Sequence, residues 1–451
     1  MIKSILFFLL IFTSLPLMGG ELVTIVVTNN ASSDGSTIVA QFNIDNGFDT
    51  DKYIFQQRKQ HAPNSVKEIF STQTGEKLGE IPEGNGSFQV LASTNEHQLT
   101  IIGHNFSAKK ELRNHKGILD GENLKNIALQ RSKNARDAIN LIDELTDKYG
   151  YSDDGFRFFI ADPSEVWMME MTGKGTMNRG AVWVARLIPD GRMAVHGTEP
   201  AIGNFPISSR NNDVLYSQDV ISFAREMGYF DGRNRDFNFK NAYTDPQSND
   251  ENSGIVRETA GLFNATIQQG SDSLSLPLFF QPSQKVSLRS VKELTKNLHH
   301  REEKDSVNTD KTVHTFIAQL RNWLPRPIGG VVWLWVGGDS IGNFQPFYIG
   351  IDEFPSSFRE KYDIIGEINR VYPNRNDSVI LDETKRIRHE LEEKYLRFAP
   401  AVEQTARALF VSNPALAVEY LTDYCYSQSL IAKRRWREYL DELQNNRSLD
   451  F

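Results

Sequence analysis

The chain has 451 residues, of which 39% are hydrophobic and 24% are charged, a composition typical of a globular protein and unlike that of disordered or fibrous chains. Its 50 lysines and arginines against 58 aspartates and glutamates give a net charge of −8, which offers no basic surface for nucleic acid. The single cysteine, Cys425, excludes an intrachain disulfide and a zinc site built on paired cysteines.

The first twenty residues have the layout of a secretory signal peptide. Lys3 gives a positive start, residues 5–12 form an unbroken apolar run, and Gly19 and Gly20 supply small residues after it. The run is too short to span a bilayer as a helix. An uncleaved anchor is the alternative, because Met18 stands where a small residue is usual. We predict cleavage near Gly20, export to the periplasm or the extracellular space, and no stable membrane insertion of the mature chain.

Short strands dominate the first part of the mature chain. Residues 22–28 are almost all β-branched and predict a buried strand. The turn-forming segment Asp34-Gly35-Ser36 follows, and residues 36–42 predict the returning strand of a hairpin. Further strands are predicted from apolar runs bounded by Gly, Pro, Asn and Asp at residues 88–92, 99–103, 156–161, 166–171, 182–188 and 331–336.

Apolar stripes at helical spacing predict helices at residues 123–149 and 216–227. From residue 382 onward the pattern is helical to the end of the chain, with boundaries marked by Pro400 and Pro414.

Two polar stretches, residues 233–254 and 296–311, lack apolar periodicity and are interpreted as surface loops. Strands in the middle and helices around them predict an α+β class.

Six short motifs follow one another along most of the mature chain. They are Ala31-Ser32-Ser33-Asp34-Gly35-Ser36, Asn95-Glu96-His97-Gln98-Leu99, Ile127-Ala128-Leu129-Gln130-Arg131, residues 160–163 with 165–171, residues 183–186 with 188–191, and residues 323–330. In this order they resemble the cysteine dipeptidases related to dipeptidase A and, more distantly, the secernins. Asp-Gly-Ser is by itself only a turn, but six motifs in sequence are hard to obtain by chance.

The resemblance implies a fold. The family is a branch of the N-terminal nucleophile hydrolases, which implies an αββα sandwich of two stacked, mostly antiparallel sheets flanked by helices. We accordingly divide the chain into a signal peptide at residues 1–20, an αββα domain at 21–377, and a helical region at 378–451 packed on the same domain.

The resemblance also implies a chemistry, the hydrolysis of dipeptides. The side chain of the first mature residue attacks the peptide carbonyl, and its own α-amine accepts the proton. Cysteine suits this task because its thiolate is reactive near neutral pH. Short peptides are the expected ligands, and no cofactor or metal is expected.

The expected nucleophile is missing from this chain. The family's spacing before Ala31 puts it at Leu22, whose side chain has neither a lone pair nor a labile proton. Thr24 lies on the same face of the strand and is an alternative nucleophile if Val23 is removed; otherwise it is a strand former. Cys425 lies in an apolar helical pattern far from these motifs and is interpreted as a buried thiol.

Other parts of the expected site also depart from the family. The asparagine that would stabilise the oxyanion falls on Thr198, a weak substitute that donates one hydrogen bond, and a nearby arginine falls on Ala201. The family's Glu-Thr-Thr corresponds to Gly103-His104-Asn105. The remaining pocket candidates are Asp45, His97, Trp167 and Arg186.

Several of these side chains have a structural alternative. His97 is interpreted first as a hydrogen-bonded structural histidine, and Glu170 and Arg186 as an ion pair across adjacent strands. His299 and His300 point in opposite directions in an extended loop, which argues against a metal site.

The departures fall at the expected active site, whereas the scaffold motifs survive. Losing a nucleophile or an oxyanion donor lowers a rate by orders of magnitude. We therefore predict a secreted member of the dipeptidase family that is catalytically degenerate and at most binds short peptides. An active dipeptidase with an unorthodox nucleophile such as Thr24, and an interaction or scaffold protein, are the alternatives. Packing of Leu22 against Val39 or Trp167 would close the pocket and exclude both catalysis and binding.

Overall fold

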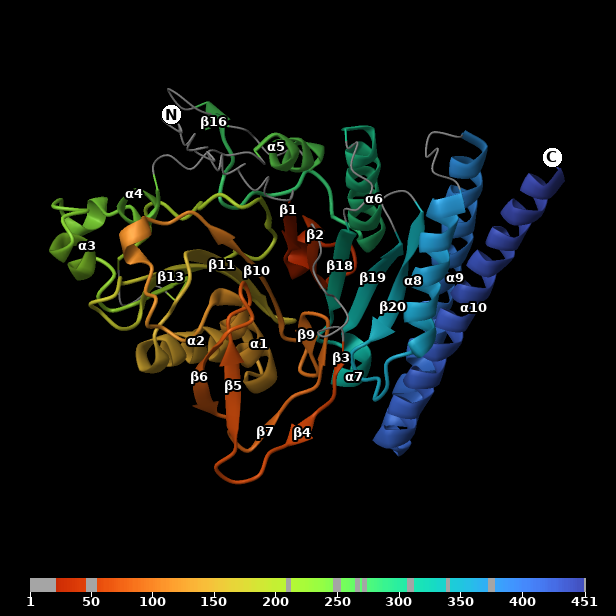
Figure 1. Ribbon diagram of the computed structural model, residues 1–451, viewed down its shortest axis with the longest axis horizontal. Coiled ribbons are helices and arrows are strands. Elements are labelled where there is room, and N and C mark those ends of the chain that lie inside the picture. Colours follow the sequence, from red (N-terminus) through yellow and green to blue (C-terminus); the bar gives the residue numbers. More distant parts are fainter. Residues whose placement is uncertain are drawn as a thin grey trace, which may run out of the picture.

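A computed structural model describes residues 22–45, 55–207, 212–245, 253–263, 268–269, 274–305, 312–337, 341–371 and 378–449. The predicted signal peptide lies outside these ranges. Two large antiparallel sheets are stacked on each other, and helices cover both outer faces (Figure 1). The αββα sandwich predicted from the resemblance is confirmed.

The six-stranded sheet contains the N-terminal hairpin. Its strands, in spatial order, are β14 (Met193–His196), β1 (Leu22–Val27), β2 (Thr37–Asp45), β18 (Thr312–Leu320), β19 (Val331–Gly337) and β20 (Gly342–Tyr348).

The eight-stranded sheet is formed by the middle of the chain. Its strands, in spatial order, are β15 (Val214–Tyr216), β13 (Ala181–Leu187), β12 (Val166–Gly173), β11 (Gly155–Ala161), β10 (Thr100–Phe106), β9 (Thr94–Asn95), β8 (Val90–Leu91) and β3 (Phe55–Gln56). Three two-stranded ribbons join β4 (Lys59–Gln60) with β7 (Gly86–Ser87), β5 (Val66–Phe70) with β6 (Lys77–Pro82), and β16 (Gln268–Gln269) with β17 (Leu274–Ser275).

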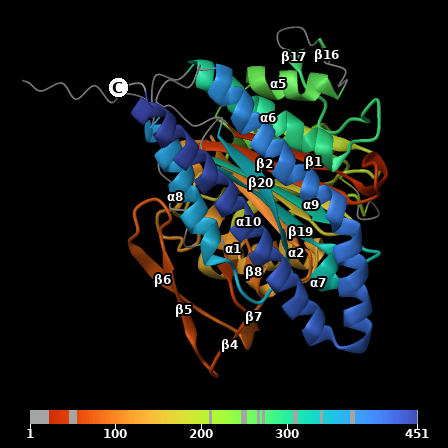
Figure 2. The ribbon, with the colours of Figure 1, turned by 90° about the vertical axis from the view of Figure 1, so that its right-hand side faces the viewer.

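Helices α1 (Gly121–Arg131) and α2 (Ala135–Tyr149) cover the outer face of the eight-stranded sheet. The outer face of the six-stranded sheet is covered by α5 (Ser253–Leu262), α6 (Leu288–Asp305), α8 (Ser356–Val371), α9 (Ser378–Ser412) and α10 (Pro414–Leu449). Figure 2 shows α8, α9 and α10 running side by side across this face. Three short helices lie in connections: α3 (Ser222–Glu226), α4 (Phe239–Tyr243) and α7 (Arg326–Gly329).

Apolar side chains separate into three clusters that correspond to the layers. Alternation along β1 divides its residues between two of them: Val23, Ile25 and Val27 face the helices, whereas Val26 faces the other sheet. The cluster between the sheets is smaller than the helix-side cluster of the six-stranded sheet, and it gives way to polar residues at one end.

Several predicted elements have different limits in the structure. The helix predicted at residues 123–149 is two helices, because Asn134 caps the start of α2 by accepting a hydrogen bond from the Asp137 N–H at 2.9 Å. Residues 216–227 begin with the end of β15, and α3 starts only at Ser222.

Both predicted surface loops contain helices. Residues 233–254 include α4 and the start of α5, and α6 continues through residue 305 of the stretch 296–311. Pro400 lies inside α9 and does not end it, whereas Pro414 does begin α10 as predicted. Buried side chains beyond Pro400, at Val402 and Ala406, hold the next turns against the core.

None of the helices in the described part of the chain combines the length and apolar character needed to span a bilayer.

Candidate active site

Strand β1 begins at Leu22, the position at which the resemblance implies a nucleophile. Leu22, Thr24 and Val26 share the face directed at the second sheet, since Val26 belongs to the cluster between the sheets and side chains alternate along a strand. Leu22 is 5% exposed and lies opposite Asn43 of β2. The first residue of the strand is therefore a buried apolar side chain on the inner face of the sandwich.

The packing partners considered for Leu22 lie in other environments. Val39 is opposite Val26 in the cluster between the sheets, and Trp167 lies on the helix-covered face of the eight-stranded sheet. Leu22 belongs to none of the three apolar clusters of described residues. Closure of a pocket by packing against Val39 or Trp167 is not what the structure shows.

A layer of buried polar residues follows Leu22 between the sheets. Thr24 pairs with Gln41 on one side and His196 on the other, so these three form a row across the six-stranded sheet. A second row crosses the eight-stranded sheet and faces the first. We call both rows together the polar layer: Thr24, Gln41, His196, His104, Arg157 and Glu170.

The centre of the polar layer is a fully buried ion pair. Both side chains of the pair have 0% exposure, and Arg157 Nε and Nη2 donate to Glu170 Oε1 at 2.9 and 2.6 Å. Two arginines or lysines in such a place would repel, whereas one cation and one carboxylate in adjacent strands satisfy each other.

The ion pair also fixes the loop that carries Thr198. Arg157 Nη1 donates to the carbonyl of Gly197 at 2.9 Å, and Arg157 Nη2 donates to the carbonyl of Glu199. At the C-terminal end of this loop, the N–H groups of residues 201 and 202 donate to the Glu170 carboxylate at 2.7 and 3.0 Å. Thr198 is half-buried in this loop. The expected oxyanion position is thus held rigidly, although it carries a hydroxyl in place of an amide.

Both histidines of the polar layer are neutral. Burial and, after it, the nearby Arg157 guanidinium lower the pKa of His196 to about 3. His196 Nε2 lies 3.0 Å from the Leu278 carbonyl, to which a neutral imidazole donates, leaving Nδ1 as an acceptor. Burial and then Arg157 also hold the pKa of His104 well below its usual range.

Thr24 has the chemistry of a weak nucleophile in an enclosed place. Its side chain is 0% exposed, its Oγ1 has no hydrogen-bond partner, and its strand neighbour is the neutral His196. A hydroxyl beside a neutral imidazole is the pairing used in nucleophilic catalysis. Thr24 lies third in the described chain, however, so its α-nitrogen is part of a peptide bond.

The other pocket candidates are dispersed. Arg186 lies on the inner face of β13, where its Nη1 donates to the Asn204 carbonyl at 3.4 Å. His97 lies between β9 and β10, where Arg326 Nη1 is 3.0 Å from its Nδ1 and the ring of Phe88 is 4.4 Å away. Burial, followed by Arg326, lowers the pKa of His97.

Trp167 contacts the Arg136 guanidinium at 4.7 Å from its ring centre, on the helix-covered side. Asp45 ends β2 opposite Thr312, and only its backbone is described. Among the predicted site residues the structure thus groups Leu22, Thr24 and Thr198 around one end of the inter-sheet layer, and it places His97 and Trp167 elsewhere.

The predicted pairing of Glu170 with Arg186 is wrong. Glu170 lies opposite Val184, and Arg186 lies opposite Met168, so the two are not neighbours across the ladder. Arg157, on the other adjacent strand, is the partner. The sequence held a signal for this pair: Arg157 lies within the apolar run Phe156–Ala161. A charge in a buried strand requires an opposite charge nearby, so a carboxylate partner on an adjacent strand could have been expected.

The surviving motifs are joined by hydrogen bonds. Asn29 Nδ2, beside the first motif, donates to the Pro163 carbonyl of the fourth at 2.9 Å. Asn95 Nδ2 of the second motif donates to the Leu129 carbonyl of the third at 2.8 Å. His97 meets Arg326 of the last motif, as described above. The motifs that carry the resemblance therefore serve as contacts of the scaffold.

Cys425 is a core residue of α10, as predicted. It has 0% exposure, and burial raises the pKa of its thiol to about 12. Among the described residues, no group of three or more His, Cys, Asp and Glu side chains is arranged to hold a metal ion.

Comparison with known proteins decides the family. The model of peptidase family C69 matches residues 22–385. The chain belongs to this family. The match begins at Leu22, the first residue of β1, and ends in the first turns of α9.

Curated relatives carry dipeptidase names. The chain is 26% identical to the probable dipeptidase B of Lactococcus lactis subsp. lactis (strain IL1403) over 381 residues, covering 76% of this chain and 77% of that protein. It is 23% identical to a probable dipeptidase of Salmonella dublin, covering 73% and 81%. A match to a probable dipeptidase of Latilactobacillus sakei, at 24% identity, spans only 53% of that protein.

Proposed function

We propose that this member of peptidase family C69 is catalytically degenerate and at most binds short peptides in the region where its relatives would hold a dipeptide. The carrying observation is Leu22. It begins both the family match and strand β1, it faces the inner layer of the sandwich, and its side chain offers no nucleophilic atom. A buried methyl-bearing side chain cannot attack a carbonyl.

The surroundings of Leu22 support retention of the site's architecture without its chemistry. The Arg157–Glu170 pair still holds the loop that carries Thr198, so the backbone around the expected oxyanion is ordered. Ordered polar groups at such a position can bind an amide carbonyl without cleaving it. A peptide bound beside Leu22 is therefore the function that this geometry supports best.

Thr24 gives a second candidate function, an active dipeptidase. Its unpartnered hydroxyl and its neutral strand neighbour His196 favour this alternative. The arrangement would require removal of residues 22 and 23 so that the Thr24 amine could serve as base. Full burial of the Thr24 side chain weighs against access of a substrate.

The decisive experiment compares two forms of the mature protein, each prepared so that residue 22 is the first. A mixture of dipeptides is incubated with the parent and with Leu22→Cys, and free amino acids are followed. We expect background hydrolysis by the parent and measurable hydrolysis by Leu22→Cys. The same two proteins, titrated with uncleaved dipeptides by calorimetry, report binding separately from turnover.

The second candidate is tested on a form prepared so that Thr24 is the first residue, with Thr24→Ala in the same form as the matched control. Clear hydrolysis by this form that Thr24→Ala abolishes would overturn the degenerate assignment and establish the second candidate. If neither form hydrolyses or binds any dipeptide, an interaction or scaffold role replaces peptide binding.

We also propose that the protein is exported. The charged start and apolar run of residues 1–20 support this, and the family match begins only after them. N-terminal sequencing of the protein recovered from the medium or periplasm of an expressing cell should give a first residue near position 21. An intact Met1 on protein retained in the cell would contradict export.

A further inference from the structure

A cavity lies between the six-stranded sheet and α9, away from the candidate active site. Its volume is ≈390 Å³, within the range of about 300–1,000 Å³ usual for small organic ligands. Its floor includes Gln319 of β18, which lies opposite Ile38 of β2, and Ile38 belongs to the helix-side cluster. Leu22 lies opposite Asn43 of β2 and faces the other sheet. The cavity and the candidate active site are therefore on opposite faces of the six-stranded sheet.

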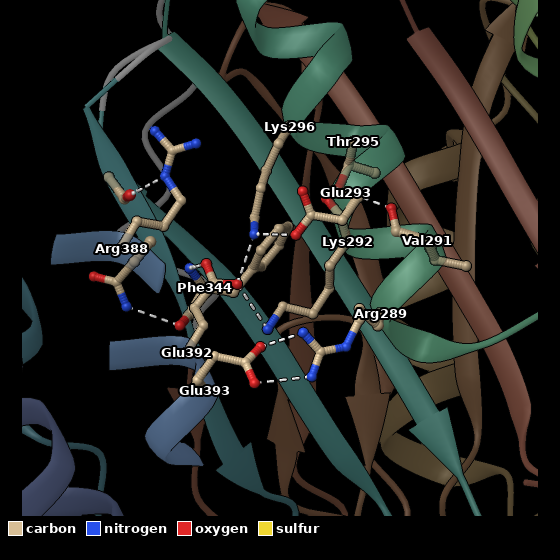
Figure 3. Close-up of polar contacts among 12 residues, drawn as sticks. Arg289, Val291, Lys292, Glu293, Thr295, Lys296, Phe344, Arg388, Glu392 and Glu393 are labelled. Carbon is tan, nitrogen blue, oxygen red and sulfur yellow. Dashed lines mark hydrogen bonds and ion pairs between the residues drawn. The ribbon is translucent and has the colours of Figure 1, made fainter. Parts of the chain in front are cut away.

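Aromatic side chains from the sheet and from two helices line this cavity. They are Trp333 of β19, Tyr348 of β20, Tyr395 of α9 and Tyr424 of α10. The rings of Tyr348 and Tyr424 have their centres 6.2 Å apart and their planes at 64°. Aromatic faces attract cations. Trp333 already does so, because Lys292 Nζ lies 4.4 Å from its ring centre, while Glu392 balances the lysine charge (Figure 3).

Oxygen atoms that can accept hydrogen bonds lie at both ends of the cavity floor, along a row of the sheet that runs from Gln319 to Tyr348. At the first end, Gln319 Nε2 donates to Asp34 Oδ2 at 2.7 Å, and Gln319 Oε1 accepts from no described residue. At the second end, the Tyr348 hydroxyl donates to Glu403 Oε1 at 3.2 Å, which leaves Glu403 Oε2 as an acceptor. The floor therefore offers acceptors to a ligand that carries N–H donors.

The charges that line the cavity leave a carboxylate without a cation. Arg321 Nη1 pairs with Glu403 Oε1 at 2.7 Å, and Arg289 at the rim pairs with Glu393. Asp34 accepts hydrogen bonds from neutral groups and forms no ion pair within the described part of the chain. Its exposed position places this negative charge at the opening of the cavity.

The walls of the cavity also contain polar groups that lack their usual partners. Pro400 of α9 has no N–H for the carbonyl of Leu396, four residues earlier, and both residues line the cavity. On the sheet side, Trp333 is 3% exposed and its Nε1 has no hydrogen-bond partner among the described residues. A buried N–H without an acceptor is costly, so an oxygen on a bound molecule would stabilise this wall.

We propose that this cavity binds a small organic ammonium compound whose aromatic body carries an oxygen acceptor. The ammonium lies at Asp34 and the free oxygen of Gln319, the ring packs among the aromatic side chains, and Trp333 Nε1 donates to the ligand oxygen. Exposed Ser33, Asp34 and Pro400 mark the opening to solvent. A carboxylate of the same shape would face the Asp34 carboxylate, so the site selects against it.

The test is calorimetric titration of the full mature protein with tyramine, which combines an ammonium group, an aromatic ring and a hydroxyl oxygen. Its acidic counterpart, 3-(4-hydroxyphenyl)propionate, has the same ring and hydroxyl but a carboxylate, and is titrated in parallel. We expect saturable binding of tyramine, at least about tenfold tighter than binding of the acid.

Ala399→Leu is the main variant because it adds bulk to the α9 side of the cavity and removes no polar group. It should weaken tyramine binding at least about tenfold. Ala401→Leu, exposed on the same helix and outside the cavity lining, is the control and should bind like the parent. Asp34→Asn removes the charge at the opening and should reduce the preference for tyramine over the acid.

The ammonium site is overturned by no saturable binding of tyramine, by equal binding to the Ala399→Leu and Ala401→Leu proteins, or by acid bound as tightly as tyramine. An unchanged preference in Asp34→Asn overturns it as well. Circular dichroism of each variant establishes that it is folded before titration. None of these readouts depends on peptide hydrolysis, and the cavity lies on the opposite face of the sheet from Leu22. The ammonium site and the proposed function therefore stand or fall separately.

Discussion

The Arg157–Glu170 ion pair has two roles in the layer between the sheets: it joins two strands and it holds a loop. Neither side chain contacts water, and both are used a second time, to hold the loop of residues 197–202. Burying a charge is favourable only when geometry and hydrogen bonds replace the lost water. The pair therefore links the order of the Thr198 loop directly to the stability of the eight-stranded sheet.

Glu170→Gln should be strongly destabilising. The substitution leaves Arg157 charged and buried without its counter-ion, which costs about 3–5 kcal/mol in comparable buried pairs. Equilibrium denaturation in urea, followed by tryptophan fluorescence, measures the change in the free energy of unfolding.

Glu165→Gln is the matched control for that measurement. Glu165 pairs with Arg136 in a partly exposed setting, with side chains 22% and 40% exposed. Exposed pairs contribute at most about 1 kcal/mol. Similar decreases in the free energy of unfolding for both variants would show that burial does not increase the contribution of the Arg157–Glu170 pair to stability.

The neutral histidines predict a loss of stability in acid. In the unfolded chain a histidine titrates near 6.5, whereas folded His196 stays neutral until about pH 3. Unfolding between these values takes up a proton, so the free energy of unfolding falls as pH decreases from about 6.5 toward 3. The contribution of one such group has a limiting slope of about 1.4 kcal/mol per pH unit. His104, whose pKa is lowered by the same burial, acts in the same direction.

Urea denaturation of the parent and of His196→Gln at a series of pH values tests this. Glutamine does not titrate, so the difference in the free energy of unfolding between the two proteins should shrink steadily below pH 6.5. Parallel profiles for the parent and the variant would contradict a neutral, buried His196.

At the scale of single elements, local capping and tertiary packing decided the helix limits. Apolar periodicity runs through residues 123–149 without interruption, but Asn134 accepts from the Asp137 N–H and starts a new helix. At Pro400 the opposite occurs, and the helix continues because its next turns are buried. The spacing of apolar residues does not reveal a capping residue inside an apolar pattern. It also does not reveal burial that compensates for the N–H group that a proline lacks.

Asn134→Ala should lower the free energy of unfolding by about 1 kcal/mol, because it removes the acceptor for the first turn of α2. Glycine at the same position tolerates the cap backbone, so Asn134→Gly should cost only a few tenths of a kcal/mol. Urea denaturation of both variants gives the two values. An equal loss in both would indicate that the side-chain cap is not the stabilising contact.

Helix α6 shows why a polar pattern was mistaken for a loop. Lys296, the first residue of the predicted loop, looks like a surface residue in sequence, yet it is buried beside Lys292 against Glu392 of a helix about a hundred residues later. Strand β20 was missed for a related reason. It contains Asn343, Gln345 and Pro346, all buried, and a proline is tolerated there because β20 is an edge strand.

Over the whole molecule, the C-terminal helices belong to the same core as the six-stranded sheet. Trp436 of α10 is fully buried and donates from Nε1 to Asn343 Oδ1 of β20 at 3.0 Å. Cys425 and Leu421 of α10 lie in the apolar cluster that also contains Val331 and Phe347. Such shared burial predicts that the helices unfold together with the sandwich.

The single thiol provides a test of this cooperativity. Cys425 is inaccessible and its pKa is raised to about 12, so a thiol reagent should label it very slowly in the native protein. In increasing urea, labelling should rise over the same range as the loss of tryptophan fluorescence.

Fully unfolded protein is the positive control for labelling and should react at one thiol per chain. Rapid labelling in the absence of urea would show that α10 detaches from the sheet independently.

Residue identity alone determined the family and the expectation that position 22 should carry its nucleophile. Six ordered motifs and the spacing before Ala31 are properties of the chain, and the absence of a nucleophilic atom in leucine needs no coordinates. The strands of the hairpin at residues 22–42 could also be predicted, since β-branched runs and an Asp-Gly turn act locally.

Only the tertiary structure decided which charges meet. Arg157 was free to pair with any carboxylate until the register of β11 and β12 set it against Glu170, and Arg186 was separated from Glu170 by the register of β12 and β13. The cavity lined by Lys292, Lys296 and Glu392 likewise exists only because α6 and α9, distant in sequence, face each other across it (Figure 3). Strand register and helix packing depend on contacts across the whole core, and for this reason they are not encoded in any local stretch of the sequence.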